Sequence, residues 1–152
     1  MHSQHCSILL GLGQPPSHMC YSCNPSIIIF QVLEEDGVTN RFKETLKLFS
    51  QVSGHSLLEK TMMMVFLNKK DTLERKIHQL SFKGYFPDFQ GNERDMPDVI
   101  EYIRSKIEEK AGNRRQIYSH VTCATDPDNV DFVFNAVNDR IVYLSMKSIG
   151  LQ

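Results

Sequence analysis

The sequence predicts an α/β fold, in which helices flank a partial parallel sheet, and three of its features support this. The apolar run Met62–Leu67 ends abruptly at Asn68, and a second strand-like run, residues 116–121, ends at Thr122. Short apolar runs bounded by polar residues are typical of buried strands, and parallel strands are apolar because helices cover both faces of their sheet. Segments with apolar residues at helical spacing lie before and after these runs.

The expected helices follow from this spacing and from residues typical of helix ends. Thr39 is placed to cap a helix over residues 39–52, and Asp95 and Pro97 mark the start of another. Asp126 and Pro127 precede a third, which has an apolar stripe over four turns. The expected helices cover residues 39–52, 72–79, 98–110 and a final segment that begins after residue 127.

Two further segments have a less regular pattern. The β-branched residues at 27–30 favour a short strand. Residues 81–92 hold four aromatic side chains among glycines and a proline, which predicts a loop pinned by buried rings. Aromatic side chains can also stack on nucleic-acid bases, but this segment carries no basic patch, so the core interpretation is favoured.

Composition excludes several classes of protein. The chain has 152 residues, 41% of them hydrophobic, and a formal net charge of −1, which argues against a nucleic-acid-binding protein. No apolar run approaches the roughly 20 residues needed to cross a bilayer, and the first residues lack the pattern of a signal peptide. We expect a cytoplasmic protein with reduced cysteines. Cys20 and Cys23 have a zinc-ligand spacing without a second pair, so no metal site is predicted.

The polar stretch NKKD, Asn68 to Asp71, fits recognition of guanine. The carboxylate of Asp71 can accept two parallel hydrogen bonds from the N1–H and N2–H2 groups of guanine, which adenine lacks. Asn68 can reach N7 or O6, and the stem of Lys69 can cover the purine face while its ammonium group stays in water. Lys70 completes the motif. Taken alone, this four-residue pattern is also compatible with a solvated loop.

The stretch TCAT, residues 122–125, is the second candidate element. It follows the second predicted strand and precedes the final predicted helix. The backbone N–H of Ala124 can donate to O6 of guanine, a contact that the amino group of adenine refuses. With the adjacent Cys123 and Thr125, this loop is the expected partner of NKKD.

Together these motifs resemble the C-terminal half of the Ras-like domain of heterotrimeric G-protein α subunits. The resemblance covers residues 31–152, and the matching stretches are QVLEEDGVTNRFKETLKLF, VFLNKKDTLERKI, YFPDFQG, IYSHVTCATDPDNVDFVFNAVNDRI and SMKSIGLQ. It implies a truncated Ras-like P-loop NTPase domain. Residues 1–30 lie outside the resemblance, and we expect them to form a non-homologous, disordered tail.

The resemblance also implies function. Family members bind GTP and GDP with Mg²⁺, hydrolyse GTP and carry signals from G-protein-coupled receptors, which their C-terminal helix contacts. The corresponding receptor-contacting residues are Ile149, Gly150, Leu151 and Gln152. The βγ dimer is a further partner in the family, but its contacts come from segments without a counterpart here. The family typically lies at the inner face of the plasma membrane.

The chain departs from the family in the part that performs hydrolysis. GTP hydrolysis needs a phosphate-loop lysine, Mg²⁺ ligands, an arginine finger and a water-positioning glutamine, and none has a counterpart in this sequence. We therefore assign no catalytic residue and expect nucleotide binding no tighter than about millimolar. The sheet is also expected to end at an uncovered apolar edge. Two alternatives stay open, a non-catalytic isoform that binds receptor and an incomplete product without a stable fold.

Overall fold

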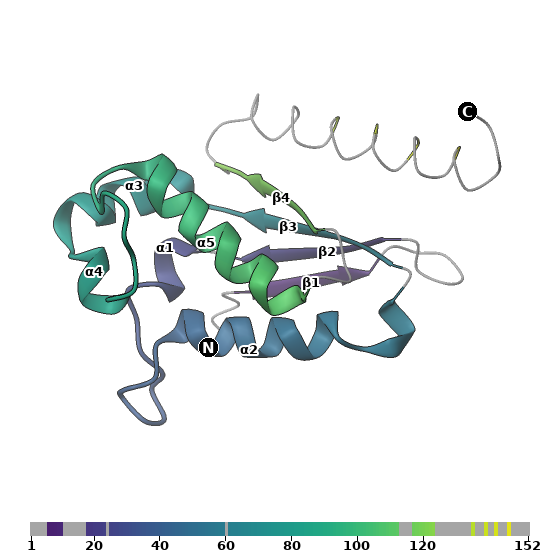
Figure 1. Cartoon of the computed structure of the whole chain (residues 1–152), viewed down its shortest axis with the longest axis horizontal. Coiled ribbons are helices and arrows are strands. Elements are labelled where there is room, and N and C mark those ends of the chain that lie inside the picture. Colours follow the sequence, from purple (N-terminus) through teal and green to yellow (C-terminus); the bar gives the residue numbers. More distant parts are fainter. Residues whose placement is uncertain are drawn as a thin grey trace.

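The computed structural model describes residues 6–10, 18–23, 25–59, 61–112 and 117–123, and the single positions 135, 139, 142 and 146. The described strands form one sheet in the order β1 (Cys6–Leu10), β2 (His18–Cys23), β3 (Met62–Leu67) and β4 (Ile117–Val121). Strands β2, β3 and β4 are parallel, whereas β1 is antiparallel to β2 (Figure 1). The predicted α/β fold is confirmed.

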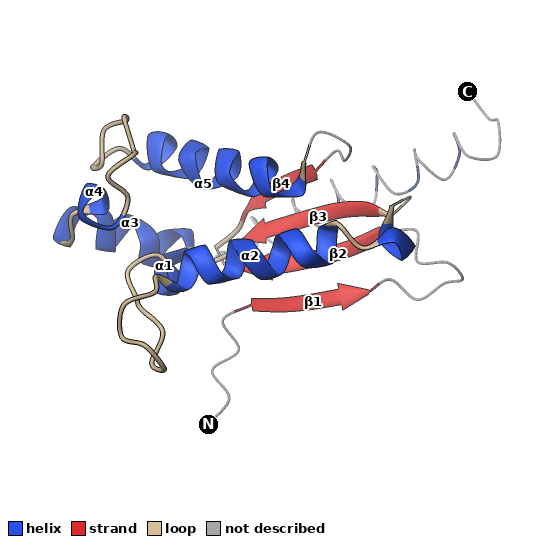
Figure 2. Ribbon diagram, turned by 60° about the horizontal axis from the view of Figure 1, so that its bottom comes forward, coloured by secondary structure: helices blue, strands red, loops and turns tan. Residues whose placement is uncertain are grey.

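The helices lie on the sheet and at its end. They are α1 (Pro25–Ile28), α2 (Arg41–Ser53), the 3-10 helix η1 (Ser56–Leu58), α3 (Lys70–Gln79), α4 (Phe82–Tyr85) and α5 (Met96–Ala111). Figure 2 shows α2 and α5 side by side along the sheet. Within the described residues, no helix is long and apolar enough to cross a membrane.

Strand β3 is buried, as predicted, and lies between β2 and β4 in the described sheet. Met63, Val65 and Leu67, which alternate along the strand, belong to the main core together with apolar residues of α2 and α5. Met64 points to the opposite face, and its exposed fraction is only 1%. Burial of both faces explains why this strand reads as a continuous apolar run rather than as an alternating one.

Within residues 1–30, where we expected a disordered tail, the structure describes residues 6–10, 18–23 and 25–30. Strand β2 pairs with β3 from His18 opposite Met62 to Cys23 opposite Leu67. An apolar parallel strand such as β3 leaves backbone donors and acceptors unpaired at each bare edge, and β2 satisfies those on one side. With β2 in this place, the described sheet ends at β1 on this side of β3. The other positions up to residue 17, and residue 24, lie outside the described residues.

The prediction of a strand at residues 27–30 is wrong. Pro25 begins the short helix α1, and a turn follows it. Ile28, Ile29 and Phe30 are all buried in the main core. A short apolar run signals burial but does not distinguish a strand from a buried helical turn, and proline at the first helical position favours the helix.

The N-cap of helix α2 lies one residue after the predicted N-cap. Asn40, not Thr39, is the N-cap, and its Oδ1 accepts a hydrogen bond from the backbone N–H of Phe42 at 2.9 Å. Its Nδ2 donates to the backbone carbonyl of Ile29 at 2.7 Å in a buried setting. Asn40 thus caps α2 and also fastens the helix to the turn after α1, whereas the hydroxyl of Thr39 donates to the carboxylate of Asp36.

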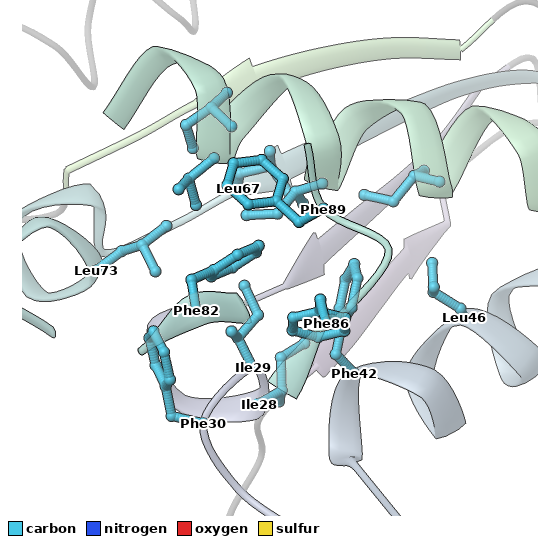
Figure 3. Close-up of a cluster of buried hydrophobic side chains, with 14 of the residues drawn as sticks. Ile28, Ile29, Phe30, Phe42, Leu46, Leu67, Leu73, Phe82, Phe86 and Phe89 are labelled. Carbon is cyan, nitrogen blue, oxygen red and sulfur yellow. The ribbon is translucent and has the colours of Figure 1, made fainter. Parts of the chain in front are cut away.

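The rings of the aromatic segment after α3 are buried in the core, as predicted, but its residues Phe82–Tyr85 form helix α4 rather than a loop. Phe82, Phe86 and Phe89 are buried, and Phe82 lies at the centre of the group (Figure 3). Its ring centroid is 4.9 Å from that of Phe89 and 5.6 Å from that of Tyr102 on α5, both in edge-to-face arrangements. Edge-to-face ring pairs add to the stabilisation that comes from area burial alone.

Helix α5 begins and ends close to its predicted bounds. Asp95 is the N-cap, and its side chain accepts a hydrogen bond from the backbone N–H of Asp98 at 3.3 Å. Gly112 follows the helix with φ +75°, a conformation that favours glycine. The hydroxyl of Tyr102 donates to Asp88 at 2.9 Å, which ties the helix to the aromatic segment.

Candidate functional site

The two predicted motifs meet at one edge of the sheet. Asn68 follows β3 and Thr122 follows β4, and the two parallel strands end in register, with Leu67 opposite Val121. The backbone N–H of Thr122 donates to the carbonyl of Leu67 at 2.9 Å. The N–H of Lys70 donates to the carbonyl of Thr122 at 3.2 Å. The carboxyl edge of a parallel sheet is where α/β proteins bind ligands.

Lys69 has a left-handed backbone conformation, with φ 61° and ψ 48°. Among the described residues other than glycine, Lys69 alone has a positive φ. Such a conformation costs a residue with a Cβ roughly 1–2 kcal/mol, and backbone strain of this kind gathers at functional sites. The turn at Lys69 takes the chain directly from β3 into α3, which places Asp71 in the first turn of that helix.

Asp71 contacts the second motif through its side chain. The Sγ of Cys123 donates to Oδ1 of Asp71 at 3.5 Å, and the hydroxyl of Thr72 lies 3.4 Å from Oδ2. Burial raises the pKa of Asp71, but hydrogen bonds from Cys123 and from the N–H of Thr72, with the charge of Arg75, outweigh it and lower the pKa overall. The carboxyl group is therefore ionised at neutral pH and acts only as an acceptor.

The other candidate residues are placed to different degrees. Asn68 is half-buried, and its Oδ1 accepts from the N–H of Lys69 at 2.7 Å. The side chains of Lys69 and Lys70 are exposed, and Lys70 bonds the second loop through its backbone. Ala124, Thr125 and the tail residues Ile149 to Gln152 lie outside the described residues.

The sequence did not point to His120 on β4, which lies two residues before the second loop. Its ring stacks on that of Phe66 on β3, with centroids 6.0 Å apart and planes at 27°. The residues occupy opposed positions in the β3–β4 register. The contact could have been predicted from the register of β3 and β4, because residues opposite each other on paired strands share a face of the sheet.

We expect the protein to lose stability as the pH falls below about 6.5, because of His120. Burial, and then the positive charge of Arg104, lower the pKa of His120 from its ordinary value of 6.5. When a histidine has a lower pKa in the folded state than in the unfolded state, its contribution to stability is fully present at pH values above the unfolded-state pKa. That contribution is lost as the pH falls through the folded-state pKa. Urea unfolding of the wild type and of His120→Phe, at about pH 7.5 and pH 5.5, measures the difference.

His120→Phe keeps an aromatic ring against Phe66 and removes the titration, so its stability should change less between the two pH values. His78, which is exposed on α3, supplies the matched control His78→Phe. An equal pH dependence in the wild type and in His120→Phe would contradict the assignment.

In the described residues, no group of three or more His, Cys, Asp or Glu side chains is arranged to hold a metal ion. The described edge of the sheet instead offers an ionised carboxylate, a side-chain amide and a strained turn.

Parallel strands followed by such a loop at their carboxyl edge are typical of α/β proteins that bind ligands at that edge. Within that class, the sequence model of one family, the G-protein alpha subunit, matches residues 26–141. The chain therefore belongs to the G-protein alpha subunit family, as the two motifs predicted.

Individual relatives agree with this assignment. The chain is 40% identical over 122 residues to the guanine nucleotide-binding protein G(o) subunit alpha of Caenorhabditis elegans, which is 80% of this chain and 34% of the relative. The proteins of the same name from Locusta migratoria and Lymnaea stagnalis are 39% identical over the same shares. The chain thus spans about a third of the length of the curated relatives that it matches.

Proposed function

We propose that this chain is the base-reading part of a guanine nucleotide-binding alpha subunit that carries signals from G-protein-coupled receptors. The observation that carries the proposal is the contact between Asp71 and Cys123, which joins NKKD and TCAT at the edge of the sheet. Both motifs must face the same base for their donors and acceptors to select guanine.

In this proposal Asp71 accepts the N1–H and N2–H2 groups of guanine. Its ionised state favours it in this role, since hydrogen bonds to a charged acceptor are stronger than neutral ones. Asn68 reaches the N7 and O6 edge, and the exposed stem of Lys69 covers one face of the ring. Lys70 and Cys123 hold the two loops together. Ala124 donates to O6 through its backbone, and Thr125 completes the loop.

In this proposal, the contacts to the phosphates and to Mg²⁺ come from other parts of the full-length family protein. The residues at the sheet edge are assigned to the guanine base alone, and we assign no hydrolytic step to them. With base contacts alone, GDP should bind with a dissociation constant no better than about 1 mM, equivalent to about −4 kcal/mol.

The partners are proposed from the family membership. A receptor would contact the C-terminal residues Ile149, Gly150, Leu151 and Gln152, which end the stretch that resembles the family's receptor-contacting helix. A βγ dimer is the family's further partner. We place the protein at the cytoplasmic side of the plasma membrane, where such receptors present their inner face.

The proposal predicts that the chain prefers GDP to ADP and that Asp71→Ala abolishes the preference. The two nucleotides share their ribose and phosphates, so a difference between them reports the base alone. Titration of the isotope-labelled chain followed by nuclear magnetic resonance detects binding in the millimolar range. Resonances of Lys70 and Thr122 should shift with GDP and much less with ADP.

Glu74→Ala is the matched control, because Glu74 is an exposed carboxylate one turn further along α3. It should keep the preference for GDP. Equal binding of GDP and ADP by the wild-type chain, or an Asp71→Ala variant with an unchanged preference, would contradict the proposed base recognition.

A further inference from the structure

A basic groove lies between α2 and the last turn of α5, on the helical layer and apart from the candidate guanine site. We define it by its lining residues: Lys43, Leu46, Lys47, Ser50, Gln51 and Lys110. Its volume is about 470 Å³, within the range of small-molecule sites. Figures 1 and 2 show the two helices lying side by side. Lys110 of α5 lines the groove together with residues of α2.

The groove follows from the spacing of residues along α2. Lys43, Lys47 and Gln51 recur every fourth residue, so they share one face of the helix. Leu46 is buried beneath this face, with an exposed fraction of 6%, and gives the groove an apolar floor. Lys110 enters from the last turn of α5. Three lysines from two helices thus line one hollow of the surface.

Carboxylates near the groove offset its charge only in part. Glu44 lies 3.7 Å from Lys47, and Glu109 lies 3.7 Å from Lys110. Both distances exceed that of a hydrogen bond, and ion pairs between exposed side chains stabilise by little. No carboxylate is among the groove's lining residues in the described part of the chain. An incoming anion can therefore displace these pairs at little cost.

We propose that the basic groove binds a compact, non-aromatic molecule with two or more phosphate groups, free in solution. Three ammonium groups, a hydroxyl and an amide supply many donors, which suits several phosphate oxygens. Among the described residues, the lining holds no aromatic side chain for a base to stack on, which disfavours a nucleotide. The volume accommodates a phosphorylated sugar or cyclitol ring. A lone phosphate would leave the groove largely unfilled.

Calorimetry of the full chain with inositol 1,4,5-trisphosphate tests the proposal. We expect saturable binding with a dissociation constant below about 1 mM, weakened roughly tenfold by Lys43→Gln and likewise by Lys110→Gln. Glutamine preserves most of each side chain's length, so circular dichroism should show an unchanged fold. Binding should also weaken as the salt concentration rises, because the charges are exposed to solvent.

Three comparisons make the result specific. Lys83→Gln, an exposed lysine on α4, should bind like the wild type, and so should Asp71→Ala, because the groove is separate from the guanine site. Inorganic phosphate should bind at least tenfold more weakly than the trisphosphate. The proposal is overturned if the trisphosphate does not bind, or if Lys83→Gln weakens binding as much as Lys43→Gln. Binding only to vesicles that contain phosphatidylinositol bisphosphate would also overturn it, because the ligand would then be a membrane surface.

Discussion

Phe82→Ala is expected to lower the free energy of unfolding by about 3–5 kcal/mol, the usual cost of removing a fully buried aromatic ring. Phe82 has an exposed fraction of 0%, and its ring packs against those of Phe86, Phe89 and Tyr102. Removing the ring leaves a cavity and breaks all of these ring contacts together. Small domains are stable by only about 5–15 kcal/mol, so this loss is a substantial fraction of the total.

Urea unfolding followed by circular dichroism measures this effect, with two variants for comparison. Phe82→Leu keeps most of the apolar volume and should cost clearly less than Phe82→Ala. Leu57→Ala, at a leucine with an exposed fraction of 79%, should leave the midpoint almost unchanged. A Phe82→Ala variant that unfolds at the wild-type midpoint would mean that the aromatic cluster does not hold the fold together.

Asp71→Asn is expected to reverse the base preference from guanine towards xanthine. An asparagine amide offers one acceptor and one donor in place of two acceptors, so its Nδ2 would oppose the N2–H2 group of guanine. Xanthine carries a carbonyl oxygen at that position, which can accept from Nδ2. Each well-formed bidentate pair discriminates by about 1–3 kcal/mol, so the GDP-to-XDP preference should change by roughly ten- to hundredfold or more.

The same magnetic resonance titration, with GDP and XDP in turn, measures this change. Glu74→Gln makes the equivalent chemical substitution on an exposed carboxylate of α3 and should leave the guanine preference intact. If Asp71→Asn still favoured GDP by the wild-type ratio, Asp71 would not be the group that reads the base.

Much of the site could be predicted because its residues are local to the strand ends. Met62 to Leu67 stops at a polar residue, and this one feature gives the strand, the position of NKKD and the edge of the sheet where ligands bind. Because β3 and β4 are parallel neighbours, their following loops had to come together. The contact between Asp71 and Cys123 shows that the two loops lie together.

What the sequence did not predict depends on contacts between distant residues. Thr39 and Asn40 are both residue types that cap helices. Asn40 is favoured because its side chain also donates to the buried carbonyl of Ile29, 11 residues earlier in the chain. The pairing of β2 with β3 also joins segments far apart, so nothing local in residues 18–23 announces it. The left-handed turn at Lys69 is a third case, because lysine carries no preference for that conformation.

The backbone ladder that joins Leu67, Thr122 and Lys70 has a thermodynamic consequence. Neither loop can open alone without breaking a bond to the other, so the two motifs form a single cooperative unit of local unfolding. A molecule that binds only one loop therefore also stabilises the other loop against opening. This coupling free energy is the same whichever of the two loops is bound.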